Sequence, residues 1–228
     1  MTSELSSRLS HVRWIAGGTG AGKSTLTRIL ADRYDVAVYI GDAAEHDWAA
    51  RLTPDRHPHG WANSKLTTGQ RAMLSPEERV SGMESLHGET IGFVIDDLLA
   101  LPVERPILVD WFGNTPRDVA PLLSWREQAV FLLPTGEFRR NALVSRFADL
   151  DRARATWGDS DHERAFANRL GRDDLWDAEV RRQATEVDLP MLIVDGSRPP
   201  AELADDLADR FRLGNAERAL DQASGEMI

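Results

Sequence analysis

The chain of 228 residues contains no cysteine, which excludes disulfides and thiolate metal sites. It also has no apolar run near the roughly 18 residues that a transmembrane helix requires. Its first ten residues are polar and lack the apolar core of a secretory signal peptide. These absences predict a cytoplasmic protein that does not span a membrane.

Lysine is scarce as well. Lys23 and Lys65 are the only lysines among 27 basic residues, and the others are arginines. Acidic residues outnumber basic ones, and the formal net charge is −10. This balance argues against nucleic acid and anionic membrane surfaces as main partners. The sequence has no [NT]-K-x-D element, so nothing in it favours GTP over ATP. We expect either a monomer or a homodimer.

Short apolar segments alternate with helical patterns along the chain. We expect strands at residues 11–16, 36–40, 105–110, 129–133 and 190–194. We expect helices at residues 24–33, from Ser75 to just before Pro102 with a break at Gly88 or Gly92, from residue 115, and at 137–145, 163–186 and 199–211. Residues 43–74 are expected to be polar and irregular. Continuous apolar strands between helices predict a parallel sheet covered on both faces, with ligands at the carboxyl ends of its strands.

Residues 17–24 match the Walker A pattern G-x-x-x-x-G-K-[ST] in full, and they lie between a predicted strand and a predicted helix. Glycines allow backbone N–H groups to point at phosphate oxygens, and the helix start adds its positive dipole end. We expect the nucleotide to contact Gly17, Gly18, Thr19, Gly20, Ala21, Gly22, Lys23, Ser24 and Thr25. Lys23 should reach the β and γ phosphates, and Ser24, or else Thr25, should offer a hydroxyl to Mg²⁺. A loop that binds nucleotide without catalysis is the alternative.

Two aspartates follow predicted strands. Asp110 ends the strand at 105–110, where P-loop proteins carry the acid that holds Mg²⁺ directly or through water. Asp42 follows the second strand, where a carboxylate can accept the proton of an attacking hydroxyl. A solvated strand end and an ordinary Gly-Asp turn are the alternatives for these two positions, and strand-end placement favours function for both.

Several arginines are candidates for phosphate binding. Arg139 and Arg146 are seven residues apart on one predicted helix, so they share a face and can neutralise a transferred phosphoryl group. A solvated basic face is the alternative for each of them. Arg198 follows the last strand, where it can stack on the nucleotide base. The charges of residues 172–174 and 181–182 lie on the predicted helix 163–186, and a solvated surface is favoured for most of them. The alternative is that their arginines face the phosphates from the far side.

Together these features resemble the nucleoside-monophosphate-kinase-like group of P-loop proteins, which includes adenylate, cytidylate, shikimate and gluconate kinases and chloramphenicol phosphotransferase. Residues 17–25, Gly-Gly-Thr-Gly-Ala-Gly-Lys-Ser-Thr, resemble the phosphate loop of this group. Tyr39-Ile-Gly-Asp42 is similar to the acidic substrate-binding element of shikimate and gluconate kinases, with Ile40 in place of its first acid. Residues 194–199, Val-Asp-Gly-Ser-Arg-Pro, are similar to the base-binding loop of adenylate kinases.

The resemblance implies a three-layer α/β/α P-loop NTPase fold with a five-stranded parallel sheet in the order 2-3-1-4-5. It implies one kinase domain at residues 1–213, a substrate-binding region at 43–100 and a helical lid at 147–162. From the sequence itself we expect a mobile tail at 214–228. ATP and Mg²⁺ are the implied cofactors, with Asp42 as the base and Arg146 as a phosphate ligand on the lid side. The expected activity is phosphoryl transfer from ATP to a small-molecule hydroxyl or phosphate. The alternative is a nucleotide-dependent ATPase or switch that binds a protein partner.

Overall fold

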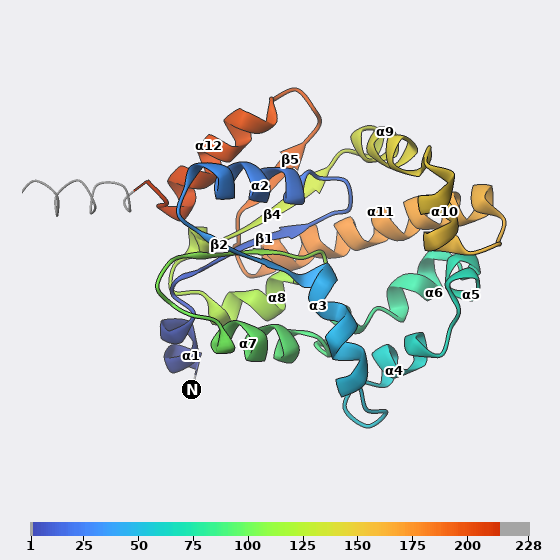
Figure 1. Ribbon diagram of the computed structural model, residues 1–228, viewed down its shortest axis with the longest axis horizontal. Helices are drawn as coiled ribbons and strands as arrows, with labels where there is room; N and C mark the ends of the chain where they lie inside the picture. Colours follow the sequence, from blue (N-terminus) through green and yellow to red (C-terminus); the bar gives the residue numbers. More distant parts are fainter. Residues whose placement is uncertain (1, 215–228) are drawn as a thin grey trace, which may run out of the picture.

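A computed structural model describes residues 2–214, so the predicted tail lies outside the described residues apart from Gly214. Five parallel strands form one sheet in the order β2-β3-β1-β4-β5 (Figure 1). The strands are β1 (Val12–Gly17), β2 (Ala37–Ile40), β3 (Ile107–Asp110), β4 (Ala129–Pro134) and β5 (Met191–Val194). The predicted sheet, its strand order and its five strand positions are confirmed.

Helices cover both faces of the sheet, which makes three layers (Figure 1). One face carries α2 (Lys23–Arg33) and α12 (Pro200–Phe211), and its buried core includes Ile15, Leu30 and Phe211. The other face carries α1 (Thr2–Arg8), α7 (Ile91–Ala100), α8 (Pro116–Val119) and α11 (His162–Glu186), around a core that contains Trp14 and Trp176. With a glycine-rich loop between β1 and α2, this architecture is the P-loop NTPase fold.

Burial along the strands explains why their continuous apolar runs predict the sheet. Every residue of β1, β3 and β4 is buried, as expected for central strands covered on both faces. The edge strand β2 alternates instead, with Val38 and Ile40 exposed while Ala37 and Tyr39 pack against the core. The continuous apolar runs therefore mark the middle of the sheet.

Residues 43–74 are helical, so the prediction of an irregular segment was wrong. They contain most of α3 (Gly41–Trp48), a 3₁₀ turn at Ala49–Arg51, α4 (Pro58–Ser64) and α5 (Thr68–Met73). Helices of six to eight residues span about two turns and are too short to display a clear apolar period. One local signal was present, because Thr67 and Gln70 form a reciprocal capping box at the start of α5.

The helix predicted from Ser75 begins there but is not continuous. Ser75 and Glu78 form a capping box, and α6 (Pro76–Ser81) ends at Gly82. A 3₁₀ turn (Glu84–His87) leads to Gly88, whose φ of 70° is left-handed, before α7 begins. The predicted break at Gly88 is confirmed, while the end at Gly82 was not anticipated.

The segment predicted as a lid lies between α9 (Gly136–Phe147) and α11, and it contains α10 (Leu150–Trp157). Asp149 caps α10 by accepting hydrogen bonds from the N–H groups of Asp151 and Arg152. Both α10 and α11 pack against α5. The contact contains a small apolar cluster with the buried residues Ala72, Ala153, Trp157 and Ala165. Within residues 2–214, no helix has both the length and the apolar character needed to cross a membrane.

The close approach of β1 to β4 generates a stability prediction. Gly17 has a φ of 109°, and a Cβ added there would overlap the backbone of Leu132. Gly17→Ala should therefore lower the free energy of unfolding by about 2–4 kcal/mol. Gly92 lies in α7 with open space around an added Cβ, so Gly92→Ala should raise it by about 0.5–1 kcal/mol. Urea denaturation of both variants tests this difference, and equal effects would contradict it.

Candidate functional site

A cavity of about 1010 Å³ opens at the carboxyl ends of the strands. Its walls come from the phosphate loop, α3, the residues after β3, the helices α9 and α11, and the segment after β5. Most of the predicted site residues line it, namely Thr19, Gly20, Ala21, Gly22, Lys23, Ser24, Thr25, Asp42, Asp110, Arg146 and Arg198. Gly17, Gly18 and Arg139 do not line it. A cavity of this size can hold a nucleotide together with a second small molecule.

The phosphate loop turns tightly before α2. Gly20 and Gly22 have φ values of 78° and 83°, which only glycine adopts without strain, and Gly22 is the N-cap of the helix. The Lys23 ammonium group donates hydrogen bonds to the carbonyl oxygens of Gly17 (3.2 Å) and Gly18 (2.7 Å). Burial lowers the pKa of Lys23, whereas the carboxylates of Asp110 and Asp42 raise it. The lysine is thus held between the loop and two acids.

Strand register brings Asp110 to the loop. In the sheet Asp110 lies beside Ile15 of β1 on one side and Ile40 of β2 on the other. Its carboxylate is 7% exposed and accepts a hydrogen bond from the Ser24 hydroxyl. Burial raises the pKa of Asp110, while Ser24 and Lys23 oppose that shift. The paired oxygens of Ser24 and Asp110 are hard donors of the type that Mg²⁺ takes, with further ligands from water and phosphate.

A second carboxylate accompanies Asp42 on α3. Asp42 lies in the first turn of that helix, and Glu45 follows three residues later on the same face. The indole N–H of Trp111, the residue after β3, donates a 2.8 Å hydrogen bond to Glu45. Loss of hydration raises the pKa of Glu45 to about 7, and Asp42 and Glu84 add to the rise while the Trp111 hydrogen bond opposes it. Sequence reasoning missed Glu45, although its spacing from Asp42 was a signal.

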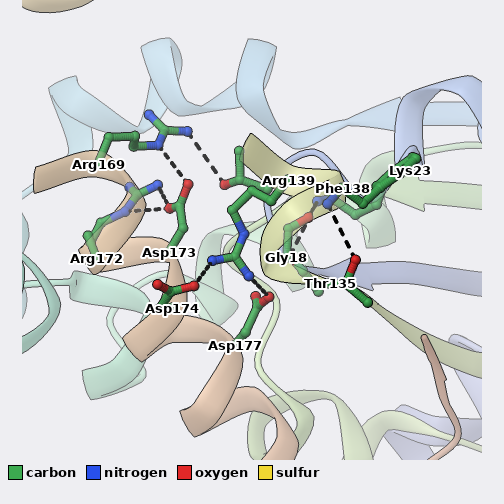
Figure 2. Close-up of polar contacts among 12 residues, drawn as sticks. Gly18, Lys23, Thr135, Phe138, Arg139, Arg169, Arg172, Asp173, Asp174 and Asp177 are labelled. Carbon is green, nitrogen blue, oxygen red and sulfur yellow. Dashed lines mark hydrogen bonds and ion pairs between the residues drawn. The ribbon is translucent and has the colours of Figure 1, made fainter. Parts of the chain in front are cut away.

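Arg139 lies behind the loop rather than in the cavity wall. It is only 2% exposed and forms ion pairs with Asp174 and Asp177 of α11 (Figure 2). Asp177 also approaches the loop, because a Cβ added to Gly18 would overlap its carboxylate. Arg139 therefore connects α9 to α11 and supports the phosphate loop through Asp177.

The other two predicted arginines line the cavity from different elements. Arg146 lines it from α9, and burial followed by repulsion from Arg169 and Arg152 lowers its pKa. Arg198 lines it beyond β5 and forms a 2.7 Å ion pair with Asp206. Around Arg198 the cavity wall is largely apolar and includes Phe138, Val194, Pro199, Pro200 and Leu203.

Residues 172–174 correct a prediction, because two of the three are buried rather than solvated. Arg172 is 6% exposed and Asp173 is fully buried. The Asp173 carboxylate accepts hydrogen bonds from both Arg169 and Arg172, as Figure 2 shows. Both faces of the long helix α11 carry charged residues. The sequence therefore does not show which of these faces packs against the rest of the protein. Arg169 and Arg172 line the cavity. Sequence reasoning missed Arg169 for that reason, and it gave Arg172 a phosphate-facing role only as the less favoured alternative.

No family model matches the chain, and no curated protein matches it. Among solved structures, the chain is similar to the crystal structure of NadR protein in complex with NAD and AMP-PNP. The two share 17% sequence identity with a TM-score of 0.37. The match covers 89% of this chain and 50% of that chain, so this chain spans about half the length of the other protein.

The raised pKa of Glu45 generates a pH prediction. A carboxyl group whose pKa rises from 4.5 to about 7 on folding stabilises the fold at low pH, and that contribution is lost as pH rises between those values. Glu45→Gln keeps the acceptor for Trp111 and has no charge to desolvate. We expect the variant to gain up to about 1 kcal/mol over the wild type above pH 7, because water in the cavity screens the effect.

Urea denaturation at pH 4.5 and pH 8 measures this difference. Glu104→Gln, which changes an exposed residue of the loop before β3, is the control and should shift stability equally at both pH values. A Glu45→Gln effect that is independent of pH would contradict the assignment.

Proposed function

We propose that the protein is an ATP-dependent phosphotransferase of the nucleoside-monophosphate-kinase-like group, acting on a small-molecule hydroxyl or phosphate. One observation carries the proposal: Lys23, the Ser24–Asp110 pair and Asp42 meet in one cavity, and residues from 45–93 form a large part of its wall. A concave cavity that extends beyond the phosphate loop suits a small acceptor. A flat exposed face there would have favoured a switch that binds a protein partner.

The nucleotide is expected to lie with its phosphates on the loop and its base near Arg198 and the apolar residues beyond β5. Lys23 would neutralise the β and γ phosphates, and backbone N–H groups at the start of α2 would bind their oxygens. Mg²⁺ held by Ser24 and Asp110 would supply further positive charge to the phosphate oxygens when bound. Arg146 would contact the transferred group from the lid side, and we assign Arg139 the support of the loop through Asp177.

The proposed reaction needs little covalent participation by the protein. The acceptor oxygen forms a bond to the γ phosphorus while the bond from that phosphorus to the β–γ bridging oxygen breaks, and the electron pair leaves on ADP. When the acceptor is a hydroxyl, its proton passes to Asp42, or to Glu45 one turn further along α3. Walls that exclude water from the transferred group would limit hydrolysis of the nucleotide.

The two lysines of the chain provide a matched test of the phosphate loop. Lys23→Ala should lower phosphoryl transfer at least about a thousandfold, because it removes the charge nearest the transferred group. Lys65 is exposed and lies outside the cavity wall, so Lys65→Ala should retain full activity. The measurement is transfer from γ-labelled ATP with Mg²⁺ to nucleoside monophosphates, sugar acids and hydroxylated antibiotics, each against a blank without acceptor. Steady hydrolysis that no acceptor changes would instead favour the ATPase or switch.

The proposed base is tested separately. Asp42→Asn should lower the rate of transfer to a hydroxyl acceptor about 10²- to 10⁴-fold while leaving the dissociation constant of the nucleotide nearly unchanged. Single-turnover transfer and calorimetric binding of AMP-PNP measure the two quantities. Full activity in Asp42→Asn would eliminate Asp42 as the base, and the same measurement on Glu45→Gln would then decide whether Glu45 has that role.

A further inference from the structure

Four arginines form a group along one wall of the cavity, and we call them the arginine row: Arg71, Arg79, Arg169 and Arg172. Arg71 belongs to α5 and Arg79 to α6, whereas Arg169 and Arg172 belong to α11. The two parts meet because α6 packs closely on α11, where a Cβ added to Gly171 would overlap Pro76. Of the four, only Arg172 was considered from the sequence as an arginine that could face the phosphates.

The row begins at the phosphate loop and leads away from it. One Arg169 nitrogen lies 3.5 Å from the Thr19 hydroxyl, which places this residue at the nucleotide end. Arg169 and Arg172 share Asp173, at 3.0 Å and 2.7 Å (Figure 2). Repulsion from Arg169 acts on both Arg172 and Arg79, so the row continues into the compartment formed by α5 and α6.

The far end of the row has positive charge without matching negative charge. Arg71 donates to the Asn63 carbonyl at 3.2 Å, and Arg79 donates to the Arg71 carbonyl at 3.1 Å. Within the described part of the chain neither arginine forms an ion pair, and the Arg71 Nε is buried without a hydrogen-bond partner. Glu84 is the carboxylate besides Asp173 whose field acts on Arg79, and Glu84 itself accepts a hydrogen bond from Asn63.

The lowered pKa values of two arginines of the row reflect this excess of positive charge. Burial, then Arg169 and Arg71, lower the pKa of Arg79 to about 10. Burial, then Arg169, lower the pKa of Arg172 to about 9. Partly buried cations that repel one another cost free energy, and a bound anion would remove that cost. Guanidinium groups also match phosphate and carboxylate oxygens in a bidentate geometry.

Resting on the proposed function, we propose that the acceptor is a small organic anion whose phosphate or carboxylate group is bound by Arg71 and Arg79. The same cavity is also lined by the buried rings of Trp48, Phe93 and Trp111, the last of which donates a hydrogen bond to Glu45. The acceptor would therefore place an apolar body against these rings and its anionic group against α5 and α6. A neutral alcohol would leave both arginines uncompensated.

Inorganic phosphate is the probe for this subsite. Its binding is measured by calorimetry with the phosphate loop already saturated by Mg·AMP-PNP, so that only a second anion site reports. We expect Arg71→Gln and Arg79→Gln each to weaken phosphate binding at least about tenfold, the loss expected for a hydrogen bond to a charged group. Arg105→Gln, at the opposite end of β3 from Asp110, should bind phosphate as the wild type does.

Phosphate that binds equally well to both variants, or does not bind beside the nucleotide, would overturn the proposal. If Mg·AMP-PNP does not bind, the proposed function fails, and phosphate binding to the wild type and the two variants without nucleotide still decides the anion site. Unfolding temperatures show whether the variants are folded. The two variants should unfold at or above the wild-type temperature without phosphate, and added phosphate should raise the wild-type value more than theirs.

Transfer assays separate the subsite from the catalytic proposal. Each acceptor is paired with a neutral counterpart, a nucleoside monophosphate with its nucleoside and an aldonic acid with its aldose. We expect transfer to one of the anions and at least about tenfold less to its neutral partner, with the phosphate and carboxylate pairs identifying which anion is used. Efficient transfer to neutral alcohols that Arg79→Gln leaves unchanged would keep the kinase and refute the anionic acceptor.

Discussion

The pairing of β3 with strands on both sides is the constraint on which the site depends. Its register aligns Asp110 with Ile15 and Ile40, so the last residue of β3 lies between the start of the phosphate loop and the start of α3. Hydrogen bonding from Ser24 then connects this acid to the first turn of α2. A slip of one residue would turn the Asp110 side chain to the other face of the sheet. Backbone pairing within the sheet therefore determines where the Asp110 side chain lies at the carboxyl ends of the strands.

The protein also buries several charged side chains close to the phosphate loop. Behind the loop, charge is balanced: Arg139 pairs with two acids of α11, and Asp173 is shared by two arginines. Elsewhere in the cavity the balance is incomplete, since Asp42 and Glu45 line it together with Arg71 and Arg79, which form no ion pair within residues 2–214. Opposite charges held apart by the walls of one cavity favour a ligand that contacts both. The balanced pairs give rigidity, and the unbalanced groups are available for binding.

How far the sequence predicts this arrangement depends on whether a signal is local. The sheet and the phosphate loop were predictable because continuous apolar strands and the glycine pattern each lie within a few consecutive residues. Asp110 followed from its position at a strand end. Arg71 and Arg79 were not predictable, since they lie on six-residue helices whose packing against α11 joins segments about 90 residues apart. Arg172 and Asp173 were misjudged because polar residues on both faces of α11 conceal which face is buried.

The contact between α10 and α5 depends largely on one side chain. Its buried members are Ala72, Ala153, Trp157 and Ala165, and the partly buried Met73, Phe147 and Phe166 pack against them. The Trp157 ring lies 4.3 Å from the ring of Phe147 and 6.2 Å from that of Phe166, measured between centroids. Because the other buried members are alanines, this indole supplies much of the apolar area of the cluster. A single tryptophan thus joins α10 to residues at the end of α9 and the start of α11, and so fixes the course of the chain between those two long helices.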